Sequence, residues 1–289
     1  MIDRFGAVLL ATALGLLVCA SSAAGQERGS TVPRVSPNAS VGQTIGVSKV
    51  DIAYSRPSAR GREIFGGLVP FGEVWRTGAN EATTISFSTP VRIDGHALDA
   101  GTYGFFTIPG PDQWTLIFNE QAKQWGAYNY DSSTDALRVQ VEPESASARE
   151  MLTFSFHNVT DSTATLALRW SETRVPFEIA VNTTAVLRSR ADEMMADASD
   201  WRAPLPYVGY ALENDILLDE ALAWINRSIE LEERFGNLRM KANVLAATGQ
   251  YAQAVETGTA ALSKAEEMEE SPNGLEQLRN QIETWNSKQ

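Results

Sequence analysis

Hydrophobic and polar residues alternate in short runs between residues 47 and 181. VSKVDIAYS, GTYGFFTI and WTLIFN are examples, and their apolar residues tend to fall at every second position. This period is typical of a β-strand that buries one face. Turn residues separate the runs, and Asp94-Gly95 predicts a tight hairpin because both residues tolerate positive φ. Roughly nine or ten such strands, without helical patterns between them, predict an antiparallel β-sandwich or barrel.

The pattern changes near residue 184, after which the chain is rich in Ala, Leu and Glu and predicts helices. LDEALAWINRSIEL and QYAQAVETGTAALSKA align weakly at an offset of 33 residues, which matches Ala221 with Ala254. This offset resembles the period of tetratricopeptide repeats, although fewer repeats are present than a free-standing solenoid needs. We therefore predict an α+β protein with a β domain at 41–183 and a helical, tetratricopeptide-like region at 184–289. We expect the helices to pack on each other and on the β domain, and to offer a surface to a protein partner.

The N-terminus has the pattern of a secretory signal peptide. Arg4 supplies a positive charge, and the apolar run at 7–20 is too short to span a bilayer. Small residues then offer a cleavage site, so we predict a signal peptide at 1–25 and a flexible lead-in at 26–40. Cys19, the only cysteine, lies inside the signal, so the processed chain cannot form an internal disulfide. We expect a periplasmic or secreted protein with no membrane span after cleavage.

The net charge and the scarcity of reactive side chains argue against several classes of function. A net charge of −12 disfavours nucleic acid and anionic membrane surfaces as partners, since both attract basic proteins. The two histidines, His96 and His157, belong to no nucleophile motif and no zinc-ligand spacing. The sequence also lacks a phosphate-binding glycine loop and a dinucleotide motif. We therefore predict no metal and no cofactor.

The segment 55–88 concentrates the remaining chemistry, because it holds four arginines in an acidic protein. Arginine binds carboxylate, sulfate or phosphate through paired N–H groups, and tryptophan offers a flat face to a sugar ring. A second stretch, FNEQAKQWGAYNYDSSTDALRV, adds aromatic and acidic residues. We expect a small anionic or glycan ligand. The candidate binding residues are Arg56, Arg62, Trp75, Arg76, Asn80, Glu81, Trp125 and Tyr130.

Structural roles compete with this interpretation. Arg76 can pair with Glu81, and the tryptophans can fill the core, because ion pairs of the framework resemble binding sites. The aromatic residues of the second stretch are expected to cap the sandwich. We expect Arg76 to be partly buried and structural, with Arg56 and Arg62 nearer to the solvent and free to bind.

Two other functions remain open. A hydrolase of glycans or esters could use Glu81 with Asp131 or Asp135 as acid and base, provided that the carboxyl groups face one cleft about 5–10 Å apart. The other is a structural assembly protein in which the helical half performs the function. Whether the protein is an enzyme is therefore left open by the sequence.

Three motifs resemble an exported bacterial family known as domain of unknown function 2911. They are SRPSARGREIFGGLVPFGEVWRTGANEATTISFS, AGTYGFFTIP, and WTLIFN followed by WGAYNYD. The resemblance covers most of residues 40–182, and the helical tail is similar to tails found in the same family. It implies an export signal and a β-rich domain. It implies no activity and no catalytic residue.

Overall fold

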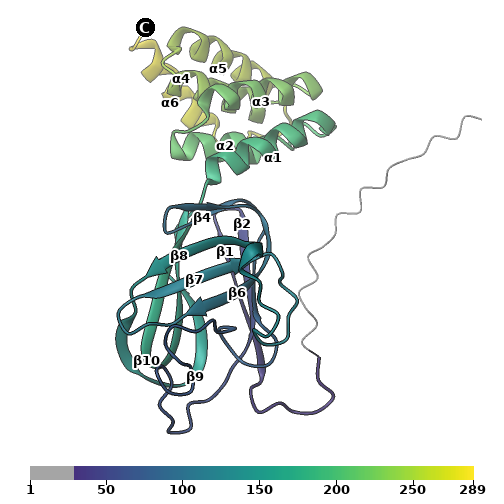
Figure 1. Cartoon of the computed structure of the whole chain (residues 1–289). Coiled ribbons are helices and arrows are strands. Elements are labelled where there is room, and N and C mark those ends of the chain that lie inside the picture. Colours follow the sequence, from purple (N-terminus) through teal and green to yellow (C-terminus); the bar gives the residue numbers. More distant parts are fainter. Residues whose placement is uncertain (1–28) are drawn as a thin grey trace, which may run out of the picture.

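The computed structural model describes residues 29–289, in which a β domain is followed by a layer of helices (Figure 1). The α+β class and the order of the two parts agree with the prediction. The predicted signal peptide at 1–25 and the first residues of the predicted lead-in lie outside the described residues.

The β domain consists of two antiparallel sheets. The larger sheet has the order β1 (Asn38–Ile45), β2 (Ser48–Ser55), β3 (Thr83–Phe87), β6 (Gly101–Ile108), β7 (Trp114–Asn119) and β8 (Asp135–Val141). The smaller sheet has the order β5 (His96–Leu98), β4 (Val91–Ile93), β10 (Thr163–Val181) and β9 (Glu144–His157). Two separate sheets make this a sandwich, which decides between the two predicted architectures.

The sandwich core lies between the inner faces of the two sheets. Ile52, Phe105 and Phe118 enter it from the larger sheet, and Leu152 and Phe177 enter it from the smaller one. In β2 every second residue is buried from Ser48 to Tyr54, as the alternating sequence predicts. The turn at Asp94-Gly95 joins β4 to β5, and both residues have positive φ, which confirms the predicted hairpin.

A long loop, residues 56–82, closes one end of the sandwich and contacts both sheets. It meets the larger sheet at Trp75, whose amide donates to Thr107 O (2.8 Å) and whose carbonyl accepts from the Thr107 amide (2.9 Å). It meets the smaller sheet at β9, where the Leu152 amide donates to Pro57 O (3.0 Å) and the Ala59 amide donates to Glu150 O (2.7 Å). Because both ends of the loop are fixed, its side chains hold defined positions.

The helical region begins directly after β10. The Asn182 side chain caps α1 by accepting from the Ala185 amide (3.0 Å), which explains why the helices begin next to the predicted boundary. Ala221 and Ala254, which the weak repeat matches, are both fully buried. The tetratricopeptide relationship itself stays a prediction. The helices are α1 (Thr183–Asp197), α2 (Leu205–Asn214), α3 (Leu218–Leu231), α4 (Phe235–Ala247), α5 (Tyr251–Glu266) and α6 (Leu275–Asn286).

The helices pack on each other and meet the β domain through polar contacts. Their hydrophobic clusters contain no strand residues, and the sandwich cluster contains no helix residue of the described chain. Across the junction, Arg190 Nη2 donates to Val47 O (3.0 Å) and Tyr210 Oη donates to an Asp161 carboxylate oxygen (3.1 Å). The expected packing on the β domain is therefore a hydrogen-bonded contact without a shared core. Between residues 29 and 289, no helix combines the length and apolar composition that crossing a bilayer requires.

We predict that residues 29–182 fold without the helices, because the sandwich core is complete within them. Circular dichroism of this fragment should show β structure, and thermal melting should be cooperative. Aggregation, or melting without a cooperative transition, would mean that the helical region contributes to the β core.

Candidate functional site

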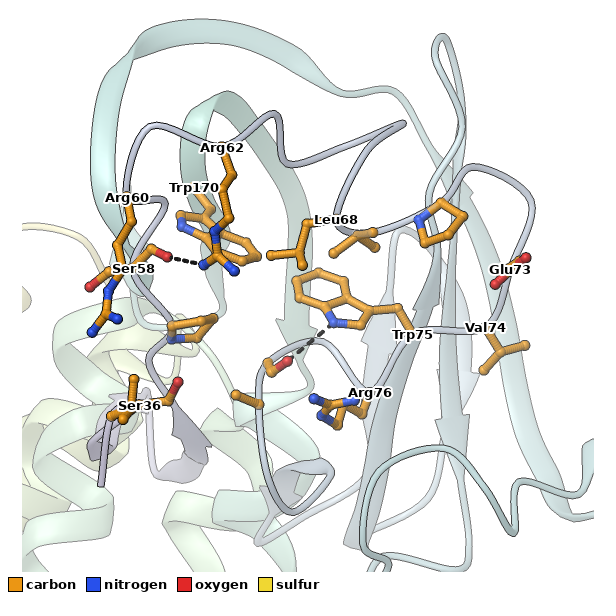
Figure 2. Close-up of a pocket in the computed structure, with 16 residues that line it drawn as sticks. Ser36, Ser58, Arg60, Arg62, Leu68, Glu73, Val74, Trp75, Arg76 and Trp170 are labelled. Atoms are coloured by element: carbon orange, nitrogen blue, oxygen red, sulfur yellow. Dashed lines mark hydrogen bonds between the residues drawn. The ribbon is translucent and has the colours of Figure 1, made fainter. Parts of the chain in front are cut away.

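The loop that closes the sandwich encloses a cavity of about 410 Å³. Its lining comes from four parts of the chain: Val35 and Ser36 before β1, the two halves of the loop, and Trp170 of β10. The loop residues include Ser58, Arg60, Arg62, Leu68, Glu73, Val74, Trp75 and Arg76 (Figure 2). Three of the predicted binding residues, Arg62, Trp75 and Arg76, therefore line one cavity.

Trp75 and Trp170 form the aromatic wall of this cavity. Their rings stack with centroids 5.9 Å apart and an angle of 19° between the planes. Trp75 Nε1 donates to Gly78 O (3.1 Å), which satisfies the one polar group of the indole. Both side chains also belong to the sandwich core, at 8% and 1% exposure. Trp75 is thus a core residue, as the structural alternative predicted, and its remaining surface faces the cavity.

Arg76 lines the cavity without a partner for its charge. Within the described chain its guanidinium makes no hydrogen bond or ion pair, and its Nε is buried and unsatisfied. Burial lowers the pKa of Arg76, and the nearby Tyr128 raises it. An arginine remains a cation at neutral pH in spite of such a shift. The expected structural role, as a partner of Glu81, is therefore wrong.

Glu81 pairs instead with Arg34, a residue of the lead-in that the sequence did not single out. Arg34 Nη1 donates to both carboxylate oxygens (2.7 and 2.8 Å), and the Glu81 side chain is 6% exposed. Beside it, Asn80 Nδ2 donates to Ser36 O (3.2 Å). Asn80 and Glu81 therefore fasten the N-terminal segment to the loop and do not line the cavity. The segment 29–36 is held by these contacts, which the expectation of a flexible lead-in did not anticipate.

Arg56 makes hydrogen bonds to the smaller sheet and does not line the cavity, which differs from the expectation that it is free to bind. Its Nε donates to Leu152 O (2.9 Å) and its Nη2 donates to Thr153 Oγ1 (2.8 Å), which ties the loop to β9. Arg62 is exposed, as predicted, and its Nε and Nη2 donate to Ala59 O (2.9 Å) and Ser58 O (2.7 Å). These bonds fix its guanidinium at the edge of the cavity, and Nη1 makes no hydrogen bond to the residues that the structure describes.

Arg60 and Trp170 also line the cavity and were not among the predicted binding residues. Arg60 belongs to the arginine cluster and is exposed at the cavity, so its local sequence could have indicated it. Trp170 lies in a strand run far along the chain, and no local pattern connects it with the loop.

The second predicted stretch packs on the outer face of the larger sheet, and none of its residues lines the cavity, although Tyr128 lies near Arg76. Trp125 is 57% exposed, and its backbone forms a bridge with Glu81. Tyr130 packs against Phe106 with ring centroids 5.2 Å apart, in a small cluster separate from the sandwich core. Its hydroxyl donates to Asp135 (2.5 Å) and accepts from Arg138. Trp125 and Tyr130 are therefore not brought together with the cavity arginines.

The carboxylates proposed for hydrolysis have other contacts. Asp135 accepts from Asn119, Tyr130 and Arg138, and Asp131 accepts from the Ser133 amide (2.9 Å) at the start of the short 3₁₀ helix η1 (Ser132–Thr134). Over residues 29–289, no group of three or more His, Cys, Asp or Glu side chains is placed to hold a metal ion.

The sequence of the β domain matches the model of a known family. Residues 36–179 match the model of the family described as "Protein of unknown function (DUF2911)". The β domain belongs to this family. The DUF2911 domain includes the whole cavity loop, whereas Arg34 and the helices lie outside the matched residues. Neither the curated proteins nor the solved structures contain a match to the chain.

Arg34 should contribute to the stability of the DUF2911 domain. Arg34→Met keeps the aliphatic stem and removes both hydrogen bonds to the buried Glu81 carboxylate. Hydrogen bonds to charged groups contribute about 1.5–3 kcal/mol, so we expect urea denaturation to show a loss of that size. Arg279→Met, which removes an exposed pair in α6, is the matched control and should change the free energy of unfolding by about 0.5 kcal/mol or less. Equal effects of the two variants would contradict a special role for Arg34.

Tyr130 should ionise only in strong base. Burial and the hydrogen bond to Asp135 raise its pKa to about 12, against the opposing effect of Arg138. Because the folded pKa exceeds the ordinary value near 10, this stabilisation is complete below about pH 10 and is lost as the pH rises toward 12. Ultraviolet titration should follow tyrosine ionisation in the unchanged protein and in Tyr130→Phe. The variant should lack the ionisation that occurs at the highest pH, because that ionisation belongs to Tyr130. Asp135→Asn should lower that pKa, and an unchanged titration would contradict the assignment.

Proposed function

We propose that the DUF2911 domain binds a small anionic ligand in the cavity, with Arg76 as the central cation. The observation that carries this proposal is the guanidinium of Arg76, which is partly buried and has no hydrogen bond or ion pair in the described chain. Taking a charge out of water costs free energy unless a partner compensates for it. A bound carboxylate, sulfate or phosphate would provide that compensation through charge-assisted hydrogen bonds.

The charges around the cavity support an anion over a neutral glycan. Arg60, Arg62 and Arg76 line it, and Glu73 is the one acidic residue among the described lining residues. The whole protein carries a net charge of −12, so this local excess of positive charge is the reverse of the overall balance. The cavity volume lies within the range of small-molecule sites.

A hydrolase has less support from the same geometry. Glu81 is held by Arg34 and does not line the cavity, and Asp135 is occupied by hydrogen bonds on the outer face of the sheet. A pair of carboxyl groups facing one cleft is therefore not found among the proposed residues. A protein partner for the helical region and an assembly role stay predictions.

The proposed location is the periplasm or the exterior of the cell. It rests on the sequence of the first 25 residues, which has the order of a signal peptide: a positive start, a short apolar run and small residues. A ligand-binding module exported in this way would meet small anions outside the cytoplasm.

The test is Arg76→Gln, which removes the charge and keeps a polar side chain. We expect the full chain to bind at least one of phosphate, sulfate, acetate and benzoate in calorimetric titration, and Arg76→Gln to bind it at least about tenfold more weakly. Its free energy of unfolding should change by about 0.5 kcal/mol or less, because no protein partner of Arg76 is lost.

Arg279→Gln, far away in α6, should leave binding unchanged and is the matched control. The proposal fails if none of these anions binds, or if Arg76→Gln destabilises the fold by about 3–5 kcal/mol, as the loss of a buried ion-pair partner would.

A further inference from the structure

Arg62 and Arg76 both line the cavity, but the contacts of their guanidinium groups differ. Arg62 is held by the carbonyls of Ser58 and Ala59, so its guanidinium is fixed before any ligand arrives. A donor group that is already oriented loses less entropy on binding. Arg76 has no such bonds and carries its charge partly buried.

The two guanidinium groups lie on different sides of the open space in Figure 2. Arg62 lies beside Arg60 and Trp170, whereas Arg76 lies on the far side of Trp75, next to the turn that contains Gly78. The ring of Trp75 borders the space between them, and Leu68 lies above that ring, on the side away from Arg76. An apolar surface thus borders the space between two cationic positions of one cavity.

This separation favours a particular class of ligand. A compact anion can occupy one cationic position but leaves the other uncompensated. A molecule with an anionic group at each end can satisfy both, and an apolar stem between the two groups would lie against the ring of Trp75. Resting on the function proposed above, we infer that the ligand is a short dianion with its two anionic groups separated by an apolar stem.

The remaining lining residues agree with this class. Arg60 is exposed at the Arg62 side and can add a donor to the same anionic group. Glu73 lies beside Val74, at the opposite side of the view from Arg60 and Arg62, so it does not neutralise them. The volume of about 410 Å³ suits a small molecule better than a polymer chain.

The experiment compares dianions with monoanions of matched length in calorimetric titrations of the full chain. One series contains straight-chain dicarboxylates and the corresponding monocarboxylates, and a second contains bisphosphonates and the corresponding monophosphonates. At the best length, a dianion of at least one series should bind about tenfold more tightly than its monoanion, or better. The series that shows this preference identifies the anionic group.

Arg62→Gln and Arg76→Gln should each remove the preference for the dianion, because each removes one of the two cationic positions. The double variant should bind the two ligands equally weakly. Arg76→Lys keeps the charge without the planar fork and should retain part of the preference. Circular dichroism melts show whether each variant is folded, and Arg279→Gln is again the control.

The inference is overturned if no dianion in either series binds more tightly than its monoanion, or if Arg62→Gln leaves the preference intact. Monoanion binding that depends on Arg76 would in that case still support the proposed function. If no anion binds at all, both the inference and the proposed function fail.

Discussion

The burial of Trp75 between the two sheets is the constraint on which the cavity depends. Its backbone pairs with Thr107 of the larger sheet, while its ring stacks on Trp170 of the smaller sheet. Successive side chains of an extended segment point in opposite directions, so fixing Trp75 inward leaves Arg76 to point elsewhere. Both side chains nevertheless line the space that the loop leaves at this end of the sandwich. This space is bordered by the rings of Trp75 and Trp170 and by Arg76, which follows Trp75 directly in the chain.

Two arginines near this loop show opposite solutions to the cost of a desolvated charge. Arg34 donates two hydrogen bonds to the buried carboxylate of Glu81, whereas the guanidinium of Arg76 has no hydrogen bond among the described residues. Acidic residues are abundant, since the chain contains 36 Asp and Glu against 24 Lys and Arg. Among the described residues none of these carboxylates pairs with Arg76, and this is the observation on which the proposed ligand rests.

The local features of the fold could be predicted because each depends on a short stretch of chain. The alternation in β2, the Asp94-Gly95 turn and the start of the helices near residue 184 all follow from neighbours in sequence. The contacts that define the site could not. Arg34 and Glu81 are 47 positions apart, and Arg56 bonds to Leu152 of β9, which is 96 positions away. An arginine cluster indicates a charged loop, but which members find partners depends on strands that no local pattern brings together.

The pair of Arg34 and Glu81 crosses the boundary that the DUF2911 match draws at residue 36. A residue inside the family segment thus depends on a charge supplied from outside it. Substituting one partner would leave the other buried with one charge partner fewer, so we expect selection to act on both together. Among related chains, positions 34 and 81 should therefore change in concert, and chains with an uncharged residue at 81 should be released from keeping arginine at 34. The segment that evolves as one unit would then begin before residue 36, where the match to the family model begins.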